Sequence, residues 1–321
     1  MAVACWTPCW SAFWSSDAAR LAMAAQSREG LAMSRRPPPP PLSDADLAPG
    51  LYLVATPIGN LRDITLRALD ILSAADLVLA EDTRVTGKLL AAYGLSKTLA
   101  RYDEHAGGRT APRALALLEQ GGRVALASDA GTPLVSDPGF PLVREVIARG
   151  LPVFAAPGPS AALAALTVSG LPAERFLFAG FLSPKSAARR RELAELAGIR
   201  ATLILFEGGS RLKASLEDMA QVLGPRPAAV AREMTKLHET LVRGPLDLLA
   251  ADPTLDHPRG EVVIVVAPGR EAAATADDAD AALAEALTRL SPGEAASEVA
   301  RALGLPRRDL YRRALDLKSA E

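Results

Sequence analysis

Cysteine and histidine are both scarce in this sequence of 321 residues. The two cysteines, Cys5 and Cys9, lie near the N-terminus, so the rest of the chain forms neither a disulfide framework nor a thiolate metal site. The three histidines, His105, His238 and His257, are far apart and show no metal-ligand spacing. We therefore expect no metal ion, and the cysteine usage fits a reducing compartment, the cytoplasm.

Aromatic residues and net charge are low as well, at 4% and -1. A sheet that stacks several nucleobases needs more aromatic side chains than this. The overall charge does not attract nucleic acid either, so any contact with RNA must come from local basic patches. No apolar run approaches the roughly 20 residues that span a bilayer, and we expect no membrane segment.

The common nucleotide and hydrolase motifs are absent. No Gly-x-Gly-x-x-Gly follows the first predicted strand, and Gly87-Lys88 lacks the neighbouring residues that a Walker A motif requires. There is also no Gly-x-Ser-x-Gly elbow and no His-Glu-x-x-His. These absences disfavour dinucleotide, P-loop, serine-hydrolase and zinc-protease chemistry.

An α/β pattern begins at Leu51, after a stretch of different composition. Residues 1–48 hold all three tryptophans and the proline run Pro37–Pro41, and we expect a disordered extension there. From Leu51 onward strands alternate with helices, which predicts βαβ units and a parallel sheet. The predicted strands of this part are Leu51–Ala55, Leu77–Ala80, Arg123–Ser128 and Pro152–Ala155.

Capping residues predict where three helices of this part begin. Asp63 would cap a helix over 64–73, and Asp137-Pro138 would open another that ends at Gly150. Ser160 would cap the helix that follows the fourth strand.

The pattern changes after about residue 173. Apolar runs at Thr202–Phe206 and Glu261–Ala267 predict strands that are covered on both faces. Between them, Ala228–Glu233 and Glu239–Arg243 predict a hairpin. We therefore expect a second α/β domain with a mixed sheet, beside the parallel-sheet N-terminal domain.

The end of the chain carries many charged residues. Ser291–Leu317 predicts two short helices joined at Gly304-Leu305-Pro306, either a helix-turn-helix-like appendage or a plain helical tail with a solvated face. The domain boundaries that we expect are 49–172, 173–270 and 271–321.

Loops rich in glycine, proline and small residues follow three of the predicted strands. They are Thr56–Asn60, Ser128–Pro133 and Pro157–Ala161. Taken singly, each is more simply an ordinary tight turn. Ligands of open parallel sheets bind outside the carboxyl ends of the strands, so three such loops together predict a shared pocket. In it, Asp129 would accept hydrogen bonds from a ribose or an ammonium group.

Six segments, in this order, resemble the ribosomal RNA small subunit methyltransferase I family of the tetrapyrrole-methylase-like superfamily. They are LYLVATPIGNLRDITLRALDIL at 51–72, AEDTR at 80–84, SDAGTPLVSDPG at 128–139, PGPSAALAAL at 157–166, AREMTK at 231–236 and RGEVVIVV at 259–266. A looser similarity extends over 292–317. The resemblance implies two α/β domains with S-adenosylmethionine in the cleft between them, usually in a homodimer. It also implies 2'-O-methylation of a cytidine in the decoding region of 16S rRNA, within the assembled small ribosomal subunit.

The same resemblance implies which residues contact the cofactor. By motif they are Pro57, Gly59, Asn60, Asp129, Ala130, Gly131, Thr132, Ser160, Ala161, Arg232, Glu233 and Met234. Two stretches depart from the family pattern. Ala106 follows Asp103-Glu104-His105, and 206–211 reads Phe-Glu-Gly-Gly-Ser-Arg. Both departures replace a polar side chain that the family commonly carries.

Methyl transfer to a ribose hydroxyl needs in-line alignment, which supplies roughly 7 kcal/mol or more, and a group that helps the proton leave. The candidates for that group are Asp82, His105 and Lys236. Each has a non-catalytic alternative. For Asp82 this is a helix cap or an ion pair with Arg84, which we favour, and for the other two it is a solvated position.

Contacts with RNA phosphates require clustered cations. The candidates are Arg84, Lys88, Lys185, Arg189, Arg190 and Arg191. A solvated helix face is the default alternative for such a run. The family resemblance favours RNA contact.

Two other functions stay open. One is a methyltransferase of the same superfamily that acts on a tetrapyrrole or another small molecule, and the basic run Arg189–Arg191 argues against it. The other is a non-catalytic ribosome-binding module, against which the intact SDAGTP and PGPSA loops argue.

Overall fold

The computed structural model describes residues 47–103, 107–256, 258, 260–269, 276–303 and 305–319. The predicted N-terminal extension lies almost wholly outside the described residues, as do His105 and Ala106. The chain divides into two compact units, of which one ends at Pro268 and the other begins at Gly269. A further boundary near residue 173 stays a prediction.

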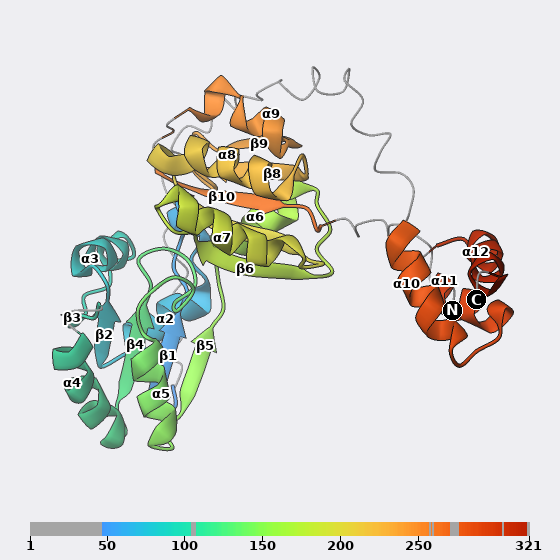
Figure 1. The fold of residues 1–321 in the computed structure, drawn as a ribbon. Coiled ribbons are helices and arrows are strands. Elements are labelled where there is room, and N and C mark those ends of the chain that lie inside the picture. Colours follow the sequence, from blue (N-terminus) through green and yellow to red (C-terminus); the bar gives the residue numbers. More distant parts are fainter. Residues whose placement is uncertain are drawn as a thin grey trace. The chain divides into compact units, whose positions relative to one another are not determined.

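Five parallel strands form the first sheet, which confirms the predicted parallel arrangement (Figure 1). The strands are β1 (Gly50–Val54), β2 (Leu77–Ala80), β3 (Leu99–Arg101), β4 (Arg123–Ala127) and β5 (Val153–Ala156). Their order in the sheet is β3-β2-β4-β1-β5. Because β1 lies between β4 and β5, the loops after these three strands leave the sheet side by side.

Helices cover both faces of this sheet. They are α2 (Leu66–Ala74), α3 (Thr83–Ala92), α4 (Gly107–Glu119) and α5 (Phe140–Ala148). Successive strand residues point to opposite faces, so Leu51 and Tyr52 of β1 enter different apolar clusters. Tyr52 packs with residues of α2 and α3, whereas Leu51 packs with residues of α4 and α5.

The start of α2 differs from the prediction. Its N-cap is Thr65, whose hydroxyl oxygen accepts the Ala68 N–H at 3.1 Å, and the helix begins at Leu66. Asp63 instead ends a short 3₁₀ helix, η1 (Leu61–Asp63). The prediction of Asp63 as the cap was wrong because two good capping residues lie two positions apart, and the intervening 3₁₀ turn decides between them.

The start of α5 also differs, whereas the cap of the next helix is confirmed. α5 begins at Phe140, after Gly139 with φ of 132°, and not at Pro138. Ser160 caps α6 (Ala161–Ser169), with its hydroxyl oxygen accepting the Leu163 N–H at 3.4 Å.

The second sheet is mixed, in the order β6-β7-β10-β8-β9. Its strands are β6 (Phe176–Phe181), β7 (Thr202–Gly208), β8 (Pro227–Arg232), β9 (Thr240–Pro245) and β10 (Glu261–Val266). β6 runs parallel to β7, while β10 runs antiparallel to both β7 and β8. β8 and β9 form the predicted hairpin.

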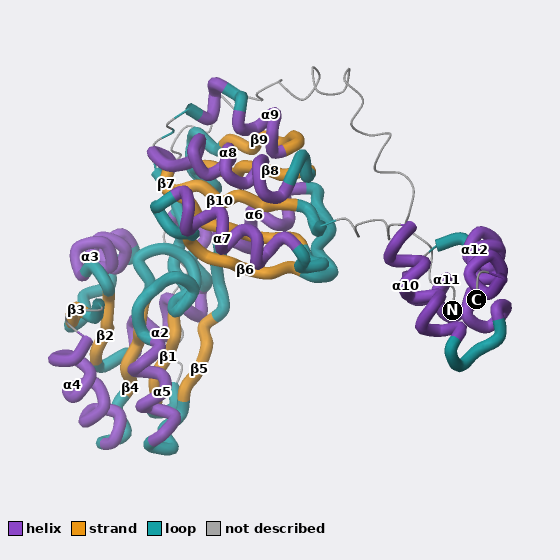
Figure 2. The backbone as a smooth tube through the Cα atoms, viewed as in Figure 1, coloured by secondary structure: helices purple, strands orange, loops and turns teal. Residues whose placement is uncertain are grey.

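Helices cover both faces of the second sheet (Figure 2). On one face lie α7 (Ser186–Ala197), α8 (Leu212–Leu223) and α9 (Leu246–Ala250). On the other face lies α6, which follows β5 of the first sheet and packs against β7, β8 and β10. α6 therefore connects the two sheets, because it follows the last strand of the first sheet and packs against the second.

Three helices form the second unit around their own small apolar core. They are α10 (Ala276–Leu287), α11 (Pro292–Leu303) and α12 (Arg307–Ser319). The last two confirm the predicted helix pair, and α10 was not predicted. Within the described residues, no helix is long and apolar enough to cross a membrane.

Candidate functional site

The loops after β1, β4 and β5 are hydrogen-bonded to one another. Thr56 and Gly131 exchange backbone hydrogen bonds of 2.9 and 3.0 Å, which join the β1 and β4 loops. The hydroxyl of Thr132 donates to the carbonyl of Pro159 at 3.1 Å, which joins the β4 and β5 loops. Three of the sequence-predicted segments are therefore brought together.

A pocket of about 330 Å³ opens between the β1 and β5 loops, the start of α6 and the segment after β8, a volume typical of small-molecule sites. It is lined by Ile58, Asp63, Thr65, Gly158, Pro159, Ser160, Ala164 and Thr235. Of these, only Ser160 was a predicted contact residue. The others all lie in the segments that carry the family resemblance, but the sequence did not single them out as contact residues.

The segment after β8 closes one side of this pocket. The Asn60 N–H donates to the Thr235 hydroxyl oxygen at 3.1 Å, across 175 positions of sequence. The Lys236 side chain lies against Gly59. A Cβ added to this glycine would lie 2.5 Å from the Cγ of Lys236. Lys236 also pairs with Glu233 at 2.9 Å. The predicted cofactor residues of the β1 loop, Gly59 and Asn60, are thus neighbours of the segment after β8.

Backbone strain is concentrated in two of the site segments. Among the described residues other than glycine, four have positive φ: Leu134, Ser136, Glu233 and Thr235. The first two follow the β4 loop and the other two follow β8. Such conformations cost about 1–3 kcal/mol each and persist where the surroundings fix them, which is common at binding sites.

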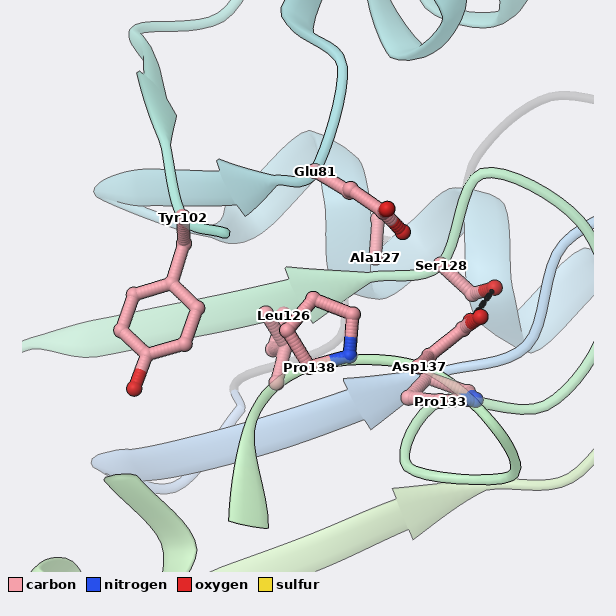
Figure 3. Close-up of a pocket in the computed structure, with 8 residues that line it drawn as sticks. All are labelled: Glu81, Tyr102, Leu126, Ala127, Ser128, Pro133, Asp137 and Pro138. Carbon is pink, nitrogen blue, oxygen red and sulfur yellow. Dashed lines mark hydrogen bonds between the residues drawn. The ribbon is translucent and has the colours of Figure 1, made fainter. Parts of the chain in front are cut away.

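A second, smaller pocket lies behind the β4 loop (Figure 3). There the Ser128 hydroxyl donates to the Asp137 carboxylate, and its oxygen accepts the Ala130 N–H at 3.1 Å. Ser128 thereby links Ala130 and Asp137, which lie on either side of the turn in the loop that carries Asp129. Burial raises the pKa of the Asp137 carboxyl above its ordinary value, although the hydrogen bond from Ser128 lowers it, and the charges of Asp129 and Glu261 raise it further.

Asp129 lies at the end of β4 in a partly buried position. Burial raises the pKa of its carboxyl, and one of its oxygens accepts the Asp82 N–H at 3.1 Å. This bond connects the loops after β2 and β4, so Asp82 stands near the predicted cofactor loops.

Asp82 has the structural role that the sequence offered as an alternative. It is the N-cap of α3 and accepts the Arg84 N–H at 2.8 Å. Its carboxylate also pairs with the Arg84 guanidinium at 2.6 Å. The hydrogen bonds from Arg84 hold the pKa of Asp82 well below its ordinary value.

The predicted basic run on α7 is divided between interior and surface. Arg189 is buried, and its guanidinium pairs with the Asp218 carboxylate at 2.6 Å. It therefore cannot contact RNA, which corrects the prediction. Arg190 donates to Gln221 of α8 at 2.9 Å, whereas Lys185 and Arg191 are exposed.

The chain matches two family models. Residues 50–250 match the model of the tetrapyrrole (corrin/porphyrin) methylases. Residues 273–318 match the RsmI C-terminal HTH domain.

Curated relatives match most of the chain. A protein of Mesorhizobium japonicum, named ribosomal RNA small subunit methyltransferase I, is 50% identical over 274 residues, which cover 85% of this chain and 93% of the relative. A protein of the same name from Erythrobacter litoralis is 52% identical over 273 residues, which cover 85% and 97%.

Solved structures with low sequence identity share the fold. A diphthine synthase has a TM-score of 0.54 at 17% identity, covering 68% of this chain and 89% of its own. A cobalt precorrin-4 methyltransferase has a TM-score of 0.51 at 19% identity, covering 68% and 94%. At these identities the likeness concerns the fold alone, and it confirms the predicted tetrapyrrole-methylase-like architecture.

Proposed function

The chain belongs to the ribosomal RNA small subunit methyltransferase I family, and on this basis we propose that it methylates the ribose 2'-hydroxyl of a cytidine in the decoding region of 16S rRNA. Methylation of small-subunit ribosomal RNA with S-adenosylmethionine follows from family membership. The position of the nucleotide and the ribose oxygen are the proposed part. The substrate is the RNA within the small ribosomal subunit, and we place the enzyme in the cytoplasm, where these subunits assemble.

The observation that carries this proposal is the meeting of the β1 and β5 loops with the segment after β8 around one pocket, while the β4 loop is hydrogen-bonded to both loops. S-adenosylmethionine supplies an electrophilic methyl group on its sulfonium when bound. The residues present fit such a ligand, because Gly158 carries no side chain while three hydroxyls and a carboxylate line the pocket. We assign the cofactor to Pro57, Gly59, Asn60, Asp129, Ala130, Gly131, Thr132, Ser160, Ala161, Arg232, Glu233 and Met234.

The proton of the 2'-hydroxyl requires an acceptor, and we assign this role to Asp82. While Arg84 pairs with it, the depressed pKa makes the carboxylate a weak base. The Arg84 side chain is 85% exposed, so an RNA phosphate can compete for its guanidinium. Release of Arg84 would raise the pKa of Asp82 toward its ordinary value. Lys236 would add a positive field, and His105 stays a prediction outside the described residues.

Contacts with the RNA backbone would come from cations around the pocket and at the start of α7. Arg84 and Lys88 lie one helical turn apart on α3, and both are exposed. Lys185 precedes α7, and Arg190 and Arg191 lie on it. Each cation that neutralises a phosphate steepens the salt dependence of binding.

We further propose a homodimer, based on the surface of α6. Seven of the nine residues of this helix are apolar, yet Leu163 and Val168 are 49% and 37% exposed. A helix that is apolar on all sides is usually buried on all sides. A second copy of the chain would cover the exposed side.

The proposal is tested by methyl transfer from labelled S-adenosylmethionine to unmodified small subunits, naked 16S rRNA or uroporphyrinogen. Label in the ribose of a single cytidine of the subunit is the expected result. Label in the tetrapyrrole would show a small-molecule methyltransferase instead. Binding to the subunit without transfer would show a ribosome-binding module.

A further inference from the structure

Asp63 has an unusual environment in the pocket. It ends the 3₁₀ helix η1 and lines the pocket, but its Oδ2 atom is buried without a hydrogen-bond partner among the described residues. A buried oxygen without a partner costs about 1–3 kcal/mol, so such atoms are rare unless a ligand satisfies them. The helix that follows does not use this carboxylate, because Thr65 is its cap.

Three hydroxyl groups line the same pocket in a common arrangement. The oxygens of Thr65, Ser160 and Thr235 each accept a backbone N–H, from Ala68, Leu163 and Asn60 respectively. A hydroxyl has one proton to donate besides its acceptor lone pairs. Since the oxygens already accept, their protons are directed elsewhere. The pocket thus offers three donors beside one carboxylate acceptor.

We propose that Asp63 and the hydroxyls of Thr65, Ser160 and Thr235 form a nucleoside-binding site, in which the Asp63 carboxylate accepts a hydrogen bond from an amine or hydroxyl of the nucleoside. The hydroxyls donate to its ring nitrogens or carbonyl oxygens. A nucleoside carries both kinds of group, and the pocket of about 330 Å³ has the volume of a small-molecule site. The site rests on the proposed function, which brings two nucleosides to the enzyme: the methyl donor and the target nucleotide.

Asp63→Ala separates a ligand-binding role from a structural one. Removal of a partnered carboxylate lowers the melting temperature, whereas removal of one with an unsatisfied buried oxygen leaves it unchanged or raises it. We expect Asp63→Ala to melt at or above the wild-type temperature and to weaken one of two interactions about tenfold. Asp63→Asn, which keeps an acceptor oxygen, is expected to retain part of the affinity.

The two interactions are measured separately on the full chain. Calorimetry with S-adenosylhomocysteine reports on the methyl-donor nucleoside, and KM for small subunits at saturating S-adenosylmethionine reports on the target nucleotide. The matched control is Asp252→Ala, because Asp252 is the N-cap of the 3₁₀ helix η3 (Pro253–Leu255) and its carboxylate does have a partner, the Thr254 N–H at 2.8 Å. It should lower the melting temperature and change neither interaction.

The two measurements identify which nucleoside Asp63 binds. A weaker affinity for S-adenosylhomocysteine identifies the methyl donor as the bound nucleoside, and a raised KM identifies the target nucleotide. If the wild type binds and methylates normally while Asp63→Ala changes neither value, or loses stability as Asp252→Ala does, this inference is overturned. If the wild type itself neither binds S-adenosylhomocysteine nor methylates subunits, the proposed function fails first.

Discussion

Asp82 and Asp129 differ in charge environment although a backbone hydrogen bond connects their loops. Arg84 stabilises the charged form of Asp82, while burial disfavours the charged form of Asp129. The sequence singled out both residues, but it could not distinguish their states. That difference depends on burial and on the folded-back Arg84 side chain, neither of which a motif encodes.

Asp82→Asn tests the proton-acceptor role at the residue scale. Asparagine caps helices about as well as aspartate, so α3 should be preserved and the melting temperature should stay close to that of the wild type. An amide cannot take the ribose proton, and we expect kcat to fall about 100-fold with little change in KM. Steady-state kinetics on small subunits provide the measurement. A variant with wild-type kcat would show that Asp82 is only a cap.

Asp137→Asn tests the effect of burial on the pKa of the Asp137 carboxyl. Burial raises the pKa of the Asp137 carboxyl in the folded state above the unfolded value of about 3.9. An acid with a raised folded pKa contributes stability below the unfolded pKa, and this contribution is lost as pH rises through the folded pKa. The variant should therefore gain stability relative to the wild type as the pH rises above about 4.

Denaturant unfolding of both proteins across this pH range measures that difference. Asp129 and Glu261, whose charges act on Asp137, are present in both proteins, so their own titration largely cancels. A difference that is constant with pH, or that shrinks as pH rises, contradicts the assignment.

The helices and strands were predictable to different degrees. The buried strands β1, β2, β4, β7 and β10 follow from apolar runs, and the β8–β9 hairpin follows from two short runs close together. β3 has only three residues, none of them fully buried, so it carries no such signal. The placement of α6 on the second sheet depends on tertiary packing and is invisible in the local pattern.

The junction between β7 and α8 contains a departure from the family pattern that the structure explains in part. Gly209 donates its N–H to the Gly260 carbonyl at 2.8 Å, and a Cβ there would lie 1.8 Å from the Pro258 carbonyl oxygen. Glycine is required at this position because another segment of backbone takes the place of a side chain. Gly208 has no such neighbour within 4 Å.

Gly209→Ala and Gly208→Ala form a matched pair at the element scale. The first should destabilise the chain by about 2 kcal/mol or more, since the backbone at Pro258 must move. The second should change the unfolding free energy by no more than about 0.5 kcal/mol. Denaturant unfolding measures both, and equal effects would contradict the packing argument.

At the scale of the whole molecule, the surface of α6 predicts self-association. Leu163→Asp places a charge on the exposed side of the helix, where desolvation in an interface would be unfavourable. We expect the wild type to sediment as a dimer and Leu163→Asp to sediment as a monomer, or to dissociate at least tenfold more readily. Thr167→Ser, on the same exposed side, serves as the control. A monomeric wild type would overturn the dimer.

The central claim is that four chain segments, distant in sequence, hold one ligand. Hydrogen–deuterium exchange of the full chain, with and without saturating S-adenosylhomocysteine, tests it most directly. We expect slower exchange on binding at 56–60, 128–133, 157–161 and 232–236, with no change in α12. Binding accompanied by protection elsewhere, with these four segments unaffected, would contradict it.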